Sequence, residues 1–285
     1  MNRVDGKVAI VTGGGKGIGR ATAVLLAKCG AKVLVTDVLD AEVEETVTSI
    51  TMNGGEAKGL HHDVTNEEDW RKAVDLAVEG LGGFEILVNN AGKFLQSSIE
   101  ETTFEEYDRV MRVNIWGVIV GTSIALASMK NRISATNPAG SIINLASVAG
   151  LKAAPFRSLY CVSKGSVRVF TQSAARECAA LGYNIRVNGI YPGLVSTDMG
   201  RIAVDGFADQ LGMDHGTALE AAKKMHLIER TASPNEIAKG IAYLASEDAA
   251  YVTGTELIID LSLIHISGPT RRTPISYAVF CLKKK

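Results

Sequence analysis

The stretch that decides the fold is KVAIVTGGGKGIGRATAVLLAKCG, residues 7–30. It begins with a short β-branched run, residues 7–12, which is typical of a buried strand. A glycine-rich turn follows at once, and the sequence ATAVLLAKCG after it predicts a helix that ends at Gly30. A strand, a glycine turn and a helix in direct succession are typical of the first unit of an open α/β sheet.

The glycines of this turn have the spacing Gly13-x-x-x-Gly17-x-Gly19 rather than the strict Gly-x-Gly-x-x-Gly fingerprint. Glycines permit a tight turn and let the backbone approach a pyrophosphate, which then lies on the N-terminus of the helix. A plain loop is the alternative, but the position between a strand and a helix favours dinucleotide binding. The residues expected to hold the pyrophosphate are Gly13, Gly15, Lys16, Gly17, Ile18 and Gly19.

Asp37 follows the second predicted strand, residues 32–36, and stands 20 residues after Gly17. A carboxylate at that place accepts hydrogen bonds from an adenosine ribose diol and repels a 2′-phosphate. Lys16 favours the opposite choice, because a cation in the turn could bind that phosphate. A carboxylate at the ribose usually outweighs a mobile lysine, so we expect NAD in preference to NADP. Helix capping is the alternative role for Asp37, although Asp40 suits that role better.

Polar residues end the next two predicted strands. The strand at residues 56–62 ends at Asp63, which could contact the adenine or cap a turn. His61 and His62 are adjacent in that strand and point to opposite faces, which favours structural or surface roles over metal binding. The strand at residues 84–88 runs into the sequence NNAG, residues 89–92. Small residues there let a ligand lie against the backbone, and Asn side chains can tie strand ends together, although an ordinary turn is equally compatible.

A second chemical signal lies in NLASVAGLKAAPFRSLYCVSK, residues 144–164. Tyr160 and Lys164 are four residues apart, so on a helix they share one face. A free tyrosine has a pKa of about 10, and a neighbouring ammonium lowers that pKa towards the range of a proton-transfer catalyst. Ser147 ends the predicted strand SIINLAS, at the sheet edge where an open α/β sheet binds its ligand. Alone, a Tyr-x-x-x-Lys pair is more often an accidental surface pair.

Composition restricts the class of protein. The net charge of −1 provides no field that would recruit nucleic acid or an acidic membrane. The four cysteines form no Cys-x-x-Cys pair, which argues against a metal site or a disulfide framework. The N-terminus lacks the apolar core of a signal peptide, and no apolar run approaches the ~18 residues of a membrane helix. We therefore expect a cytoplasmic protein without a membrane or nucleic-acid partner.

Strands and helices alternate six times along the chain, which predicts an α/β fold with a doubly wound parallel sheet. Asn114 interrupts the apolar face of a long predicted helix, residues 104–130, where a polar side chain needs a hydrogen bond. Residues 6–260 resemble the short-chain dehydrogenase/reductase family. The motifs that carry the resemblance are TGGGKGIG at residues 12–19, Asp63, NNAG at residues 89–92, Asn114, Ser147, Tyr160-x-x-x-Lys164 and PGLVST at residues 192–197.

This resemblance implies one three-layer Rossmann-type domain, residues 1–260, with a seven-stranded sheet and a nicotinamide cofactor. It also implies a catalytic tetrad of Asn114, Ser147, Tyr160 and Lys164, a substrate lid at residues 198–228 and a homotetramer. In such a tetrad Tyr160 transfers the proton, Ser147 orients the substrate oxygen, Lys164 binds the nicotinamide ribose and Asn114 holds a water. The further cofactor residues that the resemblance implies are Asp63, Val64, Asn90, Ala91, Gly92, Val113, Pro192, Gly193, Val195 and Thr197.

The sequence of residues 177–199 is similar to that of bacterial hydroxysteroid and secondary-alcohol dehydrogenases. The apolar residues of the predicted lid suggest an apolar alcohol or ketone as substrate. Two competing interpretations are a 3-oxoacyl-carrier-protein-type reductase using NADP and a nicotinamide-binding sensor without chemistry. Enoyl reductases have a longer Tyr–Lys gap and fit less well. The last 25 residues, 261–285, depart from the Asp-Gly-Gly ending of the family, show no turn signal and resemble translated sequencing-adapter sequence. We interpret them as a non-native tail.

Overall fold

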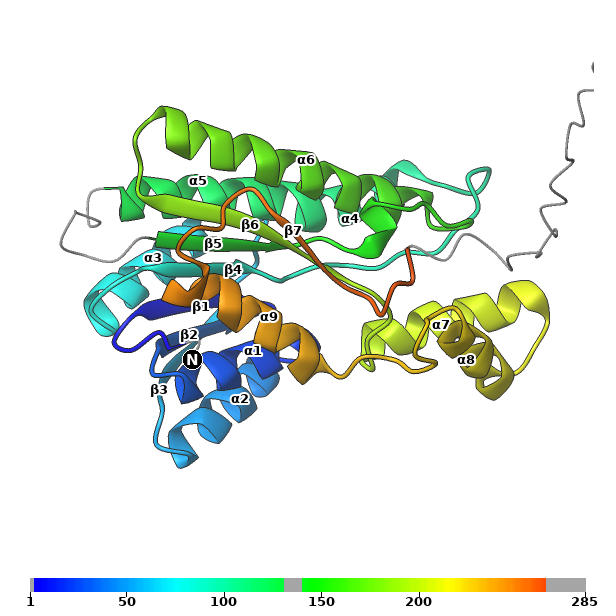
Figure 1. Cartoon of the computed structure of the whole chain (residues 1–285), viewed down its shortest axis with the longest axis horizontal. Helices are drawn as coiled ribbons and strands as arrows, with labels where there is room; N and C mark the ends of the chain where they lie inside the picture. The colour runs from blue at the N-terminus through cyan, green and yellow to red at the C-terminus, as the bar shows by residue number, and fades with distance from the viewer. Residues whose placement is uncertain (1–2, 131–139, 265–285) are drawn as a thin grey trace, which may run out of the picture.

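The computed structural model describes residues 3–130 and 140–264 (Figure 1). Residues 265–285 of the interpreted tail lie outside the described part. The strands of the described chain are β1 (Val8–Thr12), β2 (Lys32–Asp37), β3 (Glu56–His61), β4 (Ile86–Asn89), β5 (Gly140–Leu145), β6 (Ile185–Pro192) and β7 (Glu256–Ile259). Its helices are α1 (Gly17–Lys28), α2 (Asp40–Met52), α3 (Glu67–Gly80), α4 (Phe104–Met111), α5 (Gly117–Met129), α6 (Ser158–Ala180), α7 (Asp198–Leu211), α8 (His215–Lys224) and α9 (Pro234–Ala245).

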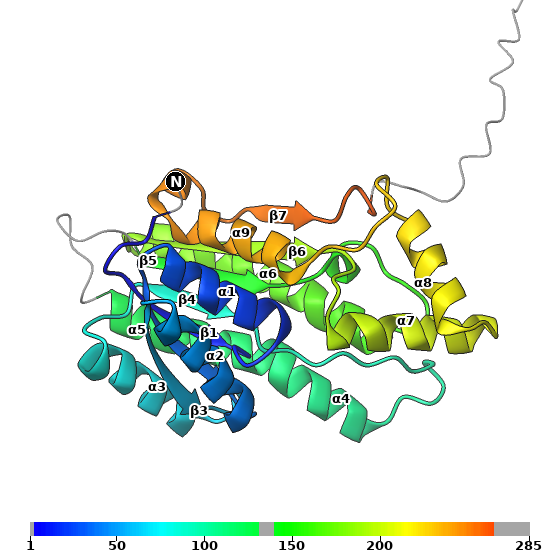
Figure 2. The same cartoon turned by 90° about the horizontal axis from the view of Figure 1, so that it is seen from below.

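The seven strands pair in parallel, in the order β3-β2-β1-β4-β5-β6-β7. The chain runs outward from β1 to β3 and then returns to the other side of β1 at β4, so the strand order reverses between β1 and β4. Helices α1, α2 and α9 cover one face of the sheet, and α3, α4, α5 and α6 cover the other (Figures 1 and 2). The expected doubly wound, three-layer α/β fold is confirmed, and such a fold binds ligands at the carboxyl ends of its strands.

Alternating side chains of each strand build two cores, one on each face of the sheet. In β1, Ala9 and Val11 join the core that α1 and α9 complete, whereas Val8 and Ile10 join the core that α3, α5 and α6 complete. A strand that is buried on both faces needs a continuous apolar run, which explains why β1 shows no polar alternation. The glycine turn therefore starts from a strand that is held on both sides.

The predicted helix over residues 104–130 changes its winding in the middle. A π-helical turn, Arg112–Trp116, lies between α4 and α5, and it contains Asn114. The continuous segment Phe104–Met129 is long and apolar enough to cross a membrane, contrary to our expectation that no such run exists. Half of its most apolar window is buried inside the fold.

A turn follows β7, and it corrects our expectation that the sequence after Asp260 forms none. The Asp260 carboxylate accepts hydrogen bonds from the backbone N–H groups of Ser262 at 2.8 Å and Ile264 at 2.9 Å. Leu261 and Ser262 adopt left-handed backbone angles there, with φ of 47° and 64°. Such angles favour glycine, so the turn has the backbone that the Asp-Gly-Gly ending of the family would adopt without strain.

The region predicted as a substrate lid, residues 198–228, forms α7 and α8 at one end of the molecule, beyond the body of the sheet (Figures 1 and 2). The two helices pack through a small cluster of their own that contains Val204, Ala208 and Ala218. The Leu227 N–H donates to the carbonyl of Leu261 at 3.1 Å, which ties the end of this region to the turn after β7. The lid assignment itself remains a prediction.

Candidate active site

The glycine turn has the geometry that a pyrophosphate site needs. Gly13 and Gly17 have φ of 61° and 54°, and a Cβ at Gly13 would lie 2.9 Å from the Cα of Ala91. Helix α1 begins at Gly17, and the Lys16 side chain before it forms no capping hydrogen bond. The first N–H groups of α1 are therefore left without a side-chain cap beside the cleft, as anion binding at a helix N-terminus requires. These features fit the diphosphate of a dinucleotide.

Gly15 and Gly19 were expected to contact the cofactor, but neither lines the cleft. A Cβ at Gly19 would lie 2.0 Å from the carbonyl oxygen of Gly13, so this glycine lets α1 pack against the turn. Gly15 lies against the Asp37 carboxylate, which accepts its N–H at 3.0 Å. Both glycines therefore allow the turn to pack closely against the rest of the chain, and neither faces the cleft.

Asp37 ends β2 at the edge of the cleft, where a ribose carboxylate is expected. Its second oxygen accepts the N–H groups of Val38 at 2.8 Å and Leu39 at 3.3 Å, so the carboxylate is held by local backbone. Asp40, which we expected to cap α2, is the first residue of that helix, and its carboxylate instead contacts His61 Nδ1 at 2.8 Å. These two N–H groups precede α2, whose N-terminus receives no capping hydrogen bond from a side chain, so neither Asp37 nor Asp40 caps this helix.

Lys16, the residue that we expected to favour NADP, is engaged by an acidic side chain that the sequence analysis missed. Its Nζ lies 3.0 Å from Glu42 Oε1 on α2. The side chain of Glu42 is only 23% exposed, and Glu42 lines the cleft beside Asp37. The contact could not be read from the sequence, because it depends on the angle at which α2 crosses the glycine turn.

The Asn-Asn pair at the end of β4 ties strand ends together, which is one of the two roles that the sequence left open. Asn89 donates to Thr122 Oγ1 at 3.2 Å and to Asn144 Oδ1 at 2.8 Å, which joins β4 to α5 and β5. Asn90 donates to the carbonyls of Thr12 at 2.8 Å and Gly13 at 3.0 Å, which holds the glycine turn against the end of β4. The two asparagines thus hold the carboxyl ends of β1, β4 and β5 together beside the cleft.

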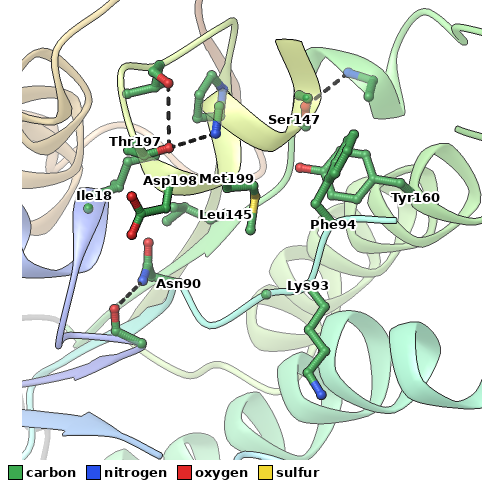
Figure 3. A pocket seen from close by; sticks show the side chains of 18 of the residues that line it. Ile18, Asn90, Lys93, Phe94, Leu145, Ser147, Tyr160, Thr197, Asp198 and Met199 are labelled. Atoms are coloured by element: carbon green, nitrogen blue, oxygen red, sulfur yellow. Dashed lines mark hydrogen bonds between the residues drawn. The ribbon is translucent and has the colours of Figure 1, made fainter. Parts of the chain in front are cut away.

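Ser147, Tyr160 and Lys164 meet where β5 ends beside α6. Figure 3 shows Tyr160 and Phe94 beside Ser147, whereas the side chain of Lys93 points away from them. Lys164 Nζ lies 5.8 Å from the centre of the Tyr160 ring and donates to the carbonyl of Leu145 at 2.8 Å. The fold therefore brings together three members of the expected tetrad, facing one cleft.

Burial determines the protonation of this cluster. It raises the pKa of Tyr160 to about 12, against a hydrogen bond from Ser147 and the charge of Arg157, which both lower that pKa. Burial also lowers the pKa of Lys164 to about 8. We expected the Lys164 ammonium to bring the pKa of Tyr160 down, and the structure differs because both groups are buried, which disfavours both charged forms. At neutral pH Tyr160 is a phenol that can donate a proton.

Asn114, the fourth member of the expected tetrad, lies behind the cleft wall rather than on it, and none of its surface is exposed. Its Oδ1 accepts the N–H of Lys93 at 2.7 Å. Its Nδ2 donates to the Lys93 carbonyl at 2.9 Å and to Ser163 Oγ at 3.0 Å. Asn114 thus has the hydrogen bonds that a buried polar side chain needs, and they fix the loop after NNAG against α6. The water assigned to Asn114 remains a prediction.

Sequence reasoning also missed Phe94 and Arg157. The ring of Phe94 packs edge-on against Tyr160 with 5.0 Å between centres. The Arg157 guanidinium lies 5.5 Å from the centre of the Phe94 ring and donates to the carbonyl of Ala203 on α7 at 3.0 Å. Among residues 3–130 and 140–264, no carboxylate pairs with Arg157. In the sequence, only the position of Arg157 directly before the Tyr160 helix could have indicated that it lies near the site.

One continuous cleft connects these parts. Its volume of about 1530 Å³ exceeds the roughly 300–1,000 Å³ of ordinary small-molecule sites, so a dinucleotide and a substrate fit together. The residues of the sequence prediction that line it are Gly13, Lys16, Gly17, Ile18, Asp37, Asp63, Val64, Asn90, Ala91, Gly92, Val113, Ser147, Tyr160, Lys164, Pro192, Gly193, Val195 and Thr197.

Comparison with known proteins agrees with this geometry. A family profile described as enoyl-(acyl carrier protein) reductase matches residues 13–261. Cyclopentanol dehydrogenase of Comamonas testosteroni is 36% identical over 91% of this chain and 98% of its own length. The NADP-dependent (R)-specific alcohol dehydrogenase of Lentilactobacillus kefiri is 36% identical over 91% and 97%. The 3-alpha-(or 20-beta)-hydroxysteroid dehydrogenase of Mycobacterium tuberculosis (strain ATCC 25618 / H37Rv) is 36% identical over 90% and 89%.

Together with the glycine turn and the Tyr160 cluster, these matches define an oxidoreductase that uses NAD or NADP and acts on CH–OH groups. More specifically, the chain belongs to the short-chain dehydrogenase/reductase family. The family resemblance that the motifs indicated is therefore confirmed.

Proposed function

We propose that this chain is an NAD-dependent dehydrogenase that interconverts a secondary alcohol and a ketone, with an apolar cyclic or steroid-like substrate. The observation that carries the proposal is that Ser147 and the buried Tyr160 lie side by side, next to Phe94, on the wall of one cleft (Figure 3). A hydroxyl pair in such a place can bind one substrate oxygen and exchange one proton with it.

Each member of the tetrad then has one task. Ser147 orients the substrate oxygen, and Tyr160 gives that oxygen a proton in ketone reduction and takes the proton in alcohol oxidation. Lys164, anchored on the carbonyl of Leu145, binds the nicotinamide ribose, while Asn114 holds a water that connects Lys164 to solvent. The nicotinamide, when bound, supplies or accepts the hydride, and the chain supplies position and electrostatics.

The cofactor preference for NAD is supported by Asp37. Its carboxylate, at the end of β2, would accept the diol of the adenosine ribose and repel a 2′-phosphate. One relative is NADP-dependent by name, so relatedness alone does not decide the choice. For the remaining cofactor contacts we propose the cleft residues already named, with the PGLVST segment, residues 192–197, at the carboxamide end.

The substrate class is supported by the side chains around Tyr160. The apolar residues that line this end of the cleft are Phe94, Pro155, Phe156, Leu194, Met199 and Phe207. Aromatic and aliphatic walls suit a compact apolar ring, because burial of its surface drives binding. Relatives named for cyclopentanol and for hydroxysteroids support the same class. We also propose that the protein is cytoplasmic.

The test is a substrate panel with each cofactor, read by nicotinamide absorbance. Cycloalkanols, hydroxysteroids and sugars should be compared with NAD and NADP, and 3-oxoacyl thioesters with NADH and NADPH. We expect the highest kcat/KM for an apolar cyclic alcohol with NAD. Preference for 3-oxoacyl thioesters with NADPH would instead support the carrier-protein reductase. Cofactor binding without turnover of any panel member would support the sensor.

A further inference from the structure

Two basic side chains border the part of the cleft next to Asp37, and each is paired with a carboxylate of α2. Lys16 Nζ lies 3.0 Å from Glu42 Oε1, and an Arg20 guanidinium nitrogen lies 2.9 Å from Glu45 Oε2. All four of these residues line the cleft. Lys16, directly before α1, and Arg20, in the first turn of α1, are thus each joined to α2 by an ion pair at the place where a ribose phosphate would enter.

The Lys16 pair contains the more buried carboxylate, since the side chain of Glu42 is 23% exposed and that of Glu45 is 66% exposed. The hydrogen bond between Lys16 and Glu42 raises the pKa of the amine and lowers the pKa of the carboxyl, so both stay charged at neutral pH. A Cβ built at Gly15 would lie 3.0 Å from both Asp37 Oδ2 and Glu42 Cβ, which places the two acidic residues beside the same turn. The charge of Asp198 also raises the pKa of Lys16, but more weakly.

Arg20 is held even more firmly. Its Nε donates to the carbonyl of Gly15 at 2.7 Å, and one of its terminal guanidinium nitrogens reaches both Glu45 and, at 3.4 Å, the carbonyl of Glu42. A guanidinium engaged in this way must break these bonds before it can bind a phosphate. A 2′-phosphate would therefore have to displace existing carboxylate contacts before it could bind either Lys16 or Arg20.

We propose that Glu42 is a second determinant of cofactor choice: it neutralises Lys16, so that removal of Asp37 alone leaves no cation ready for a 2′-phosphate. This inference deepens the proposed NAD preference and rests on it. Asp37 repels the 2′-phosphate directly, whereas Glu42 occupies the residue that would otherwise attract it. A change of preference to NADP then requires both carboxylates to be neutralised.

The experiment measures binding of two fragments of the cofactor, 5′-AMP and adenosine 2′,5′-bisphosphate, by calorimetry, so that turnover is not needed. The variants are Asp37→Ala, Glu42→Gln and the double variant. Glu44→Gln is the matched control, because Glu44 lies on the same helix but is exposed and does not line the cleft. Thermal unfolding of each variant establishes that it is folded.

We expect the wild type to prefer 5′-AMP, and each single variant to change the ratio of the two affinities by less than about tenfold. In the double variant, the affinity ratio of bisphosphate to 5′-AMP should rise about tenfold beyond the product of its changes in the two single variants. This factor is the size of one charge-assisted phosphate contact. Addition of Lys16→Met to the double variant should remove this gain. Glu44→Gln should match the wild type.

The inference is wrong if Asp37→Ala alone binds the bisphosphate as tightly as the double variant, or if the two single effects simply multiply. A gain that survives Lys16→Met would also overturn it. A wild type that already prefers the bisphosphate, or binds neither fragment, would contradict the proposed NAD preference itself. The two failures are therefore distinguishable.

Discussion

Lys164 Nζ lies 5.8 Å from the centre of the Tyr160 ring and donates a hydrogen bond, at 2.8 Å, to the carbonyl of Leu145. The ammonium therefore lies over the tyrosine ring, but its hydrogen bond goes to the last carbonyl of β5. Burial raises the pKa of Tyr160 to about 12 and lowers the pKa of Lys164 to about 8. The chain holds two ionisable groups in a place that favours the neutral form of each.

Replacement of Lys164 by Met should stabilise the protein at pH 7 while it abolishes turnover. The pKa of Lys164 is lowered to about 8 in the folded state, so burial of the charged amine costs stability below that pH, and the cost disappears as pH rises towards the unfolded pKa of 10.5. After the loss of the hydrogen bond to Leu145 is subtracted, we expect the free energy of unfolding at pH 7 to rise by about 2 kcal/mol. Urea unfolding at pH 7 and at pH 9 checks this, and the gain should be smaller at pH 9.

Arg157 should help to set the pH dependence of alcohol oxidation. Its charge lowers the pKa of Tyr160, so Arg157→Met should move the rise of kcat for oxidation to higher pH and slow the reaction severalfold at pH 8. Arg157→Lys keeps the charge and should keep the profile close to that of the wild type. A profile that is identical in all three proteins would show that the charge of Arg157 does not set the pKa of Tyr160.

The protein should assemble as a symmetric homotetramer, with the helix containing α4 and α5 and the helix α6 pairing across two-fold axes. Phe104 on α4 and Val162 and Val169 on α6 are 73%, 57% and 66% exposed in the single chain. Val169→Asp should weaken assembly, since it places a charge in that surface. Light scattering at micromolar concentration is the measurement, and a monomeric wild type would contradict the prediction.

The turn after β7 should tolerate glycine better than its present residues. Ser262 has φ of 64°, and a non-glycine residue in that conformation costs about 1–2 kcal/mol. Ser262→Gly should therefore raise the free energy of unfolding by about 1 kcal/mol, after the greater chain entropy of glycine is subtracted. Ala250→Gly, at φ of −57°, is the control and should lower stability. A destabilising Ser262→Gly would contradict the strain assigned to this turn.

The alternation of apolar runs and helices was sufficient to predict the sheet, because strands buried on both faces leave an unambiguous pattern. The sequence spacing also placed Ser147, Tyr160 and Lys164 in one cleft. It could not show how deeply the cluster is buried, and therefore predicted the wrong direction for the pKa of Tyr160. The Lys16–Glu42 pair depends on how α2 crosses the glycine turn. Likewise, the π-helical turn contains Asn114, whose contacts with Lys93 and Ser163 only the folded chain reveals.

The central claim is that Tyr160 transfers the proton in a hydride-transfer reaction on a secondary alcohol. The most direct measurement compares wild type and Tyr160→Phe for nicotinamide reduction with cyclopentanol and NAD, together with NAD binding by calorimetry. Loss of the hydroxyl removes the acid and base but keeps the ring, so kcat should fall by at least about 100-fold while the Kd for NAD stays unchanged. Turnover in Tyr160→Phe close to that of the wild type would contradict the account.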